Sequence, residues 1–138
     1  MLTVTHARRS RLRRQSNGKR ICLSPRDVEI FRLLDRYRYL RSSFICAFFP
    51  EADQTGLVKR LGDLFHEGYL ERPAQQYQYA NALYLPAVYE LNAQSEAVLR
   101  ECGRDDLPIV LQRGRMGAYR HFSHALMIAD ILASSSLA

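Results

Sequence analysis

The chain has 138 residues, of which 47% are hydrophobic and 25% charged, and its formal net charge is +6. This length suits one domain with a hydrophobic core, and the composition is ordinary for a soluble globular protein. No apolar run approaches the roughly 20 residues of a membrane helix, and none follows the basic N-terminus as in a secretory signal, so we expect a cytoplasmic protein with no membrane partner.

The first 21 residues are polar, basic and without hydrophobic periodicity, so we expect residues 1–21 to form a flexible arm. Residues 1–20 hold seven basic residues and no acidic one, which leaves 13 of the 20 basic residues and all 14 acidic residues for the rest of the chain. Such an arm is typical of segments that bind a phosphate backbone or another anionic surface. Its basic residues are Arg8, Arg9, Arg11, Arg13, Arg14, Lys19 and Arg20. The alternative is a solvated leader that binds nothing specific.

A first helix is predicted over residues 25–37. Ser24 can cap its free amides, Pro25 is tolerated at the first helical position, and Asp27 suits the positive end of the helix dipole. Its apolar residues share one face: Ile30, Phe31, Leu33, Leu34 and Tyr37.

A short strand and a second helix are predicted next. Tyr39-Leu40 favours the strand, and Ser42 or Ser43 is expected to cap a helix over roughly 43–49 that Pro50 ends.

A third helix is predicted over residues 54–67, and it is the candidate recognition helix. Its apolar face comprises Leu57, Leu61, Leu64 and Phe65. Thr55, Lys59, Asp63 and His66 point to the other side, with Arg60 at the edge. Gly68 stands where a helix C-cap glycine belongs. A helix that ends on glycine and runs into a strand is typical of a winged helix-turn-helix, although any amphipathic helix followed by a hairpin has the same pattern.

A hairpin, the candidate wing, is predicted after the third helix. Its strands fall near residues 69–72 and 87–91, and Gln75 and Gln76 are expected at or near its tip. Because the tip lacks Lys and Arg, any minor-groove contact there would use amides, tyrosine or backbone.

Two C-terminal helices are predicted, over residues 93–102 and about 118–133. The last one carries two apolar stripes, and a helix that is apolar on both sides needs two partners. We therefore predict a homodimer with its interface at Phe122, Leu126, Met127, Ile128 and Ile131. Alternatively, this helix packs against a further domain that the chain lacks.

These elements predict a mainly α fold with a small β-wing, that is, a winged helix-turn-helix followed by C-terminal helices. The expected organisation is a basic arm over 1–21, a winged-helix domain over 22–92 and a dimerisation region over 93–138.

Four segments of the chain carry a family resemblance: LSPRDVEIFRLLDRYRYLRSSFICAFFP, RLGDLFHEGYLERP, VYELN and HFSHALMIADILAS. They resemble the replication-relaxation family of winged-helix proteins, found in bacteria, their plasmids and mobile elements. The resemblance covers about residues 22–134. It implies a DNA-binding fold and a role in plasmid replication, transfer or transcriptional control. Family members are often longer, so the chain resembles an N-terminal half or a short form.

No pattern in the sequence predicts an enzyme, a cofactor or a small-molecule substrate, and the resemblance carries over no catalytic residue. His121 and His124 lie three residues apart on a predicted helix, but no third ligand has suitable spacing, so no metal site is predicted. The three cysteines form no CxxC pair.

The predicted ligand is double-stranded DNA. The third helix would enter the major groove, the arm would follow the backbone or enter the minor groove, and the wing would add amides. Outside the arm, the predicted contact residues are Gln54, Thr55, Lys59, Arg60, Gln75 and Gln76. The alternative is a winged-helix module that binds another protein. A third possibility, which charge alone leaves open, is that the arm binds RNA.

Overall fold

The computed structural model describes residues 10–18, 20–78, 84–102 and 122–138. Helices dominate it, together with one small three-stranded antiparallel sheet, which confirms the coarse fold prediction. In chain order the elements are α1 (Pro25–Tyr37), β1 (Leu40–Arg41), α2 (Ser42–Ala47), α3 (Gln54–His66), β2 (Leu70–Glu71), the 3-10 helix η1 (Ala74–Gln78), β3 (Val88–Leu91), α4 (Ala93–Glu101) and α5 (Phe122–Leu137).

The two longest helices of the N-terminal half begin and end where local signals place them. α1 matches its predicted range, and its first turn forms a capping box in which Ser24 and Asp27 bond each other's backbone amides. α3 ends one residue before the predicted boundary. Gly68 follows it with φ +91°, and the amides of Gly68 and Tyr69 bond the carbonyls of Phe65 and Leu64, which is a Schellman ending.

α2 differs from its prediction at both ends. It starts at Ser42, and its N-cap is Arg41, which makes no side-chain capping bond. The expected serine cap is therefore wrong. The Ser42 amide instead donates to the carbonyl of Ala87 at 2.7 Å, continuing the pairing of β1 with the chain that enters β3.

The sheet has the order β1-β3-β2, so β3 is its central strand. Leu40 pairs with Tyr89 on one side of β3, and Leu70 pairs with Leu91 on the other. After β2 the chain returns, and β3 inserts between β1, which precedes α2, and β2, which follows α3.

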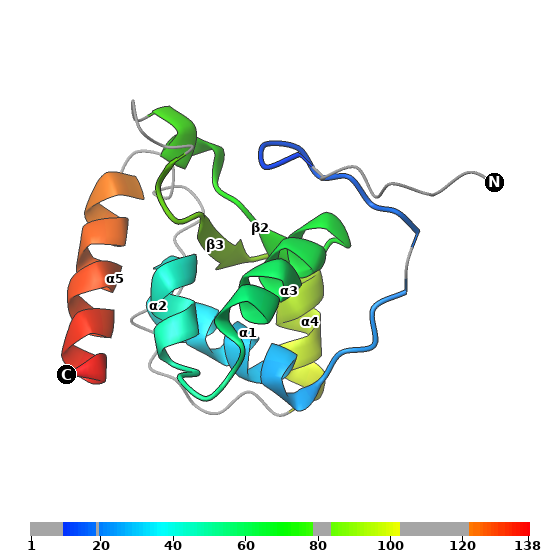
Figure 1. The fold of residues 1–138 in the computed structure, drawn as a ribbon, viewed down its shortest axis with the longest axis horizontal. Coiled ribbons are helices and arrows are strands. Elements are labelled where there is room, and N and C mark those ends of the chain that lie inside the picture. Colours follow the sequence, from blue (N-terminus) through cyan, green and yellow to red (C-terminus); the bar gives the residue numbers. More distant parts are fainter. Residues whose placement is uncertain (1–9, 19, 79–83, 103–121) are drawn as a thin grey trace.

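One main core joins the helices to the sheet. Fully buried leucines from α3 pack with residues of α1, β1, β2 and α4, for example Leu57, Leu61, Leu64, Leu34, Leu40, Leu70 and Leu99. α5 lies along one side of the molecule, next to α2 (Figure 1), and adds Ala129 and Ala133 to this core.

α5 packs on the body through part of the surface that was expected to form a dimer. Phe122 and Leu126 are buried against Tyr39 and Val88, and the Tyr39 and Phe122 rings meet edge-on at 5.1 Å. Their assignment to a dimer interface is therefore wrong, because their own chain covers them. Residues 118–121, where the prediction began this helix, lie outside the described residues. In the described ranges no helix combines the length and apolar character needed to cross a membrane.

Candidate nucleic-acid interface

The outer face of the N-terminal half of α3 is the most accessible part of this helix. Asp53 caps the helix by accepting a hydrogen bond from the Gly56 amide at 3.1 Å. Beyond the cap, Thr55, Val58 and Lys59 are exposed. No hydrogen bond or ion pair joins the Lys59 ammonium to a residue that the structure describes. The helix can therefore present a hydroxyl, an apolar group and a cation side by side.

Arg60 does not belong to this exposed surface. Its guanidinium forms two bonds with Asp27, Nε to Oδ1 at 3.0 Å and Nη2 to Oδ2 at 2.5 Å, and Nη2 also donates to the carbonyl of Cys22 at 3.0 Å. Asp27 is completely buried. The prediction that Arg60 reads DNA is therefore wrong, because its guanidinium donors bind Asp27 and the Cys22 carbonyl and so connect α3 to the start of α1.

The ion pair with Arg60 lowers the pKa of the Asp27 carboxyl. Burial by itself would raise its pKa, but the hydrogen bonds from Arg60 and Ser24 and the positive charge of Arg60 together hold the pKa below its ordinary value. Asp27 thus remains ionised, and it serves two elements at once: the cap of α1 and the anchor of α3.

Gln54 closes the turn between α2 and α3. Its side-chain amide donates to the carbonyls of Phe49 at 3.1 Å and Ala52 at 3.0 Å. This group was expected to hold a phosphate, but its donors are directed at the protein's own backbone. Gln54 is nevertheless exposed, and its contact with a phosphate stays a prediction.

Gln76 holds the segment between β2 and β3 that was predicted to form the wing. Its described residues, 72–78 and 84–87, are here called the wing region. The amide nitrogen of Gln76 donates to the carbonyls of Pro73 and Val88, and its oxygen accepts from the Val88 amide at 2.8 Å. Gln76 is buried in η1, so its expected position at a hairpin tip facing DNA is wrong. Gln75 is half-buried in the same short helix, and residues 79–83, further along the expected tip, lie outside the described residues.

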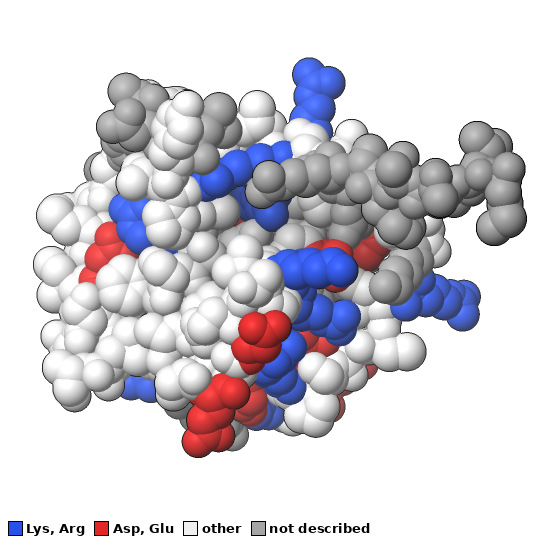
Figure 2. Space-filling view, in the orientation of Figure 1, with Lys and Arg blue, Asp and Glu red and all other residues white. Residues whose placement is uncertain are grey.

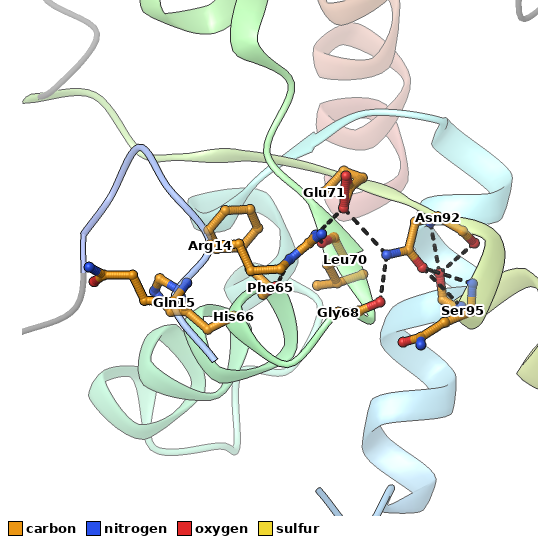
Figure 3. Close-up of polar contacts among 10 residues, drawn as sticks. Arg14, Gln15, Phe65, His66, Gly68, Leu70, Glu71, Asn92 and Ser95 are labelled. Atoms are coloured by element: carbon orange, nitrogen blue, oxygen red, sulfur yellow. Dashed lines mark hydrogen bonds and ion pairs between the residues drawn. The ribbon is translucent and has the colours of Figure 1, made fainter. Parts of the chain in front are cut away.

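Part of the expected flexible arm lies on the body. Residues 10–16, here called the N-terminal strap, cross the corner where α3 turns into β2. Arg14 reaches into this corner, where Nε donates to the carbonyl of Phe65 and Nη2 to that of Leu70, each at 2.8 Å, and Nη2 pairs with Glu71 (Figure 3). Its guanidinium also lies 5.1 Å from the centre of the Phe65 ring.

Backbone and side-chain contacts beside Arg14 complete this anchor. The Gln15 amide donates to Nδ1 of His66 at 3.0 Å, and the Ser16 hydroxyl donates to Glu67 at 2.7 Å. His66 was expected to face outward from α3, but it is only 4% exposed, because the N-terminal strap covers it.

A second anchor connects the N-terminal strap to the wing region. The carbonyl of Arg11 accepts hydrogen bonds from Arg72 and from the Tyr77 hydroxyl, each at 3.0 Å, and the Arg11 guanidinium donates to the carbonyl of Leu85. Arg72 in turn lies over Phe65, 4.3 Å from the ring centre, and donates to the Tyr89 hydroxyl at 2.8 Å.

The predicted arm cations therefore divide into three groups. Arg11 and Arg14 make protein contacts, which contradicts their assignment to a free DNA-binding arm. Arg13 and Arg20 are exposed. Arg8, Arg9 and Lys19 lie outside the described residues.

The surface around α3 carries charges of both signs. Figure 2 shows basic side chains over the middle of this face and acidic side chains beside them, rather than one unbroken basic surface. The structure brings Thr55 and Lys59 together on α3 and keeps Arg60 and Gln76 inside the fold. Two further exposed side chains were not part of the prediction: Val58 of α3, which is 50% exposed, and Tyr84, which precedes β3 in the chain and is 90% exposed.

Comparisons of the chain with protein-family models, with curated proteins and with solved structures found no match. The resemblance to the replication-relaxation family remains a prediction from the sequence.

Proposed function

We propose that the chain is a winged-helix protein that binds double-stranded DNA through the N-terminal half of α3. The observation that carries this proposal is the element order α1-β1-α2-α3-β2-β3 with the sheet order β1-β3-β2. In this arrangement α2 and α3 form the helix-turn-helix pair, α3 is the recognition helix, and β2 and β3 border the wing.

Three neighbouring side chains of α3 would read the major groove. Lys59 donates to guanine acceptors or to a phosphate, and the Thr55 hydroxyl contacts a base edge. Val58 offers an apolar surface that suits a thymine methyl group. With Arg60 committed to Asp27, Lys59 is the main cation of this face, so the intrinsic affinity of the helix is modest and the basic N-terminal segment has to contribute.

The exposed arginines of the N-terminal segment would supply sequence-independent affinity. Arg13 and Arg20 can neutralise phosphates, and each phosphate contact releases counterions and so makes binding depend on salt. On the family resemblance, we propose a cytoplasmic transcriptional regulator or an accessory protein of plasmid replication or transfer.

One observation favours a second candidate, a winged-helix module that binds another protein. Several of the expected DNA-binding groups, namely Arg60, Gln76 and Arg14, are engaged within the fold, which leaves α3 with a mixed polar and apolar surface. Such a surface suits a protein partner as well as a base pair.

The two candidates are tested by measuring the affinity of the chain for labelled duplex DNA across a salt series. One duplex has a random sequence, and the other comes from the region upstream of the protein's own gene. We expect Lys59→Glu to weaken DNA binding by about tenfold or more. The salt slope, that is, the slope of the logarithm of the binding constant against the logarithm of the salt concentration, should fall in magnitude by at least about one. The matched control is Arg100→Glu, which makes the same charge change at an exposed residue of α4, a helix that packs on α1. Failure of the native chain to bind DNA at low salt, or equal losses in both variants, would reject recognition by α3.

A further inference from the structure

The wing region, as far as the structure describes it, is poor in outward-facing cations. Residues 74–78 and 84–87 include no Lys or Arg, and the adjoining strands contribute Glu71 and Glu90. Arg72 is turned inward, where it contacts the Phe65 and Tyr89 rings. A wing of this composition has little to offer a phosphate backbone.

The N-terminal strap lies against this region and is fixed at two points. Arg14 holds one end to the carbonyls of Phe65 and Leu70, and the Arg11 carbonyl holds the other to Arg72 and Tyr77. These contacts come from α3, β2, η1 and the strap itself, so the N-terminal strap joins the end of the recognition helix to the wing region (Figure 1).

The N-terminal strap is also closed upon itself. The Ser10 amide donates to the Gln15 side chain at 2.6 Å, and the Ser10 hydroxyl accepts from the amides of Leu12 and Arg13 at 3.1 and 3.2 Å. This is the local bonding of a serine turn, which restrains the backbone on either side of Arg13. Arg13 is thus an exposed cation on a restrained loop between the two anchors.

We infer that the docked N-terminal strap is a working part of the wing and supplies its phosphate-binding cation, Arg13, to double-stranded DNA. Arg14 is the positioning residue, because it ties the loop to the corner between α3 and β2. This inference rests on the proposed function. It adds a second DNA contact, between Arg13 and a phosphate, to the contact that α3 makes in the major groove.

The physical gain is pre-organisation. A free arm loses backbone and side-chain entropy when DNA orders it, whereas a docked loop has already lost most of this entropy during folding. Undocking the loop should therefore weaken DNA binding even when the total charge is unchanged.

The test compares DNA binding by full-length Arg14→Lys, Arg14→Gln and Arg20→Gln. Lysine keeps the charge of Arg14 but lacks the planar guanidinium that donates from Nε and Nη2 to two carbonyls and lies over the Phe65 ring, so it should undock the loop. We expect about fivefold to tenfold weaker binding for Arg14→Lys, a larger loss for Arg14→Gln, and only about twofold to threefold for Arg20→Gln, which removes one exposed charge. Hydrogen exchange of residues 10–16 in the same variants should rise for both Arg14 substitutions and stay unchanged for Arg20→Gln.

Arg13→Gln provides the direct test of the contact. It should leave hydrogen exchange of the loop unchanged and reduce the salt slope by about one. If the native chain binds DNA and Arg14→Lys binds equally well or more tightly, the inference is overturned while the proposed function stands; tighter binding would mean that the loop blocks the DNA. If the native chain binds no DNA, both fall together.

Discussion

Arg60 and its neighbour Lys59 show how adjacent cations on one helix take different roles. Arg60 satisfies a completely buried carboxylate, and removal of one partner of a buried ion pair costs about 3–5 kcal/mol. Because Arg60 itself is partly exposed, we expect Arg60→Gln to lower the free energy of unfolding by about 3 kcal/mol, at the lower end of that range. Urea unfolding followed by circular dichroism measures this change.

Lys59→Gln is the matched control for that substitution. It removes the same charge one residue earlier from an exposed position, so the free energy of unfolding should change by no more than about 0.5 kcal/mol. DNA binding should respond in the opposite order once both proteins are folded, with the larger loss for Lys59→Gln. Equal destabilisation by the two substitutions would contradict the structural role of Arg60.

The same ion pair predicts a pH dependence of stability. The pKa of Asp27 is lower in the folded chain than its usual value of 3.8, so its contribution to stability is complete above that value and is lost as the pH falls through the folded-state pKa. We therefore expect Asp27→Asn to destabilise the protein more at about pH 6 than at about pH 3. Urea unfolding at several pH values gives the two differences.

Glu51→Gln serves as the reference in the pH series, because Glu51 is an exposed carboxylate. Its effect on stability should be small at every pH. A destabilisation by Asp27→Asn that does not change with pH would show that the carboxylate is not held ionised by Arg60.

At the scale of elements, the junction of α3 with β2 depends on backbone conformation at Gly68. This residue has φ +91°, and a Cβ atom there would lie 3.1 Å from Oε1 of Gln94. We expect Gly68→Ala to destabilise the protein by about 1–2 kcal/mol, since L-residues are strained in this region. Thermal or urea unfolding provides the measurement.

Gly62 offers a contrasting substitution within the same helix. It lies in the middle of α3, and among the described residues its added Cβ would meet Nη2 of Arg72 at 3.4 Å, which is an ordinary van der Waals contact. Gly62→Ala should leave stability unchanged or raise it by up to about 1 kcal/mol, because alanine favours the helix. If both alanines acted alike, conformational strain at Gly68 would not be the cause.

At the scale of the whole molecule, α5 leaves an uncharged apolar surface uncovered. Met127, Ile128, Ile131 and Leu132 are exposed, while Asp130, the one charged residue of α5, pairs with Arg41 of β1. An uncharged face can meet its own copy across a twofold axis without repulsion. We propose a homodimer through this face, and such a dimer would carry two copies of the proposed recognition helix.

Sedimentation across a concentration series tests the dimer. Ile131, which is 60% exposed, can be changed to glutamate without burying the charge in the monomer, and we expect Ile131→Glu to shift the protein to a monomer. Leu85→Glu makes the same change at an exposed leucine of the wing region and should leave the dimer intact. A native chain that is monomeric at all concentrations would exclude this interface.

The sequence determined by itself those features that depend on residues a few positions apart. α1 begins at Pro25 because Ser24 and Asp27 satisfy its first amides, and α3 ends before Gly68 because glycine takes the left-handed turn without strain. The apolar periodicity of α3 likewise fixed its buried face. These are short-range effects, and the folded chain keeps them.

Tertiary structure decided which polar groups remain available for a ligand. Arg60 meets Asp27 across 33 positions, Gln76 meets Val88 across 12, and Arg14 meets Phe65 across 51. No local pattern encodes such partners, because an isolated helix wheel shows an arginine or glutamine at its edge as solvent-exposed. A buried carboxylate or backbone amide must still be satisfied once the chain is compact, and the nearest polar side chain in space, rather than in sequence, then satisfies it.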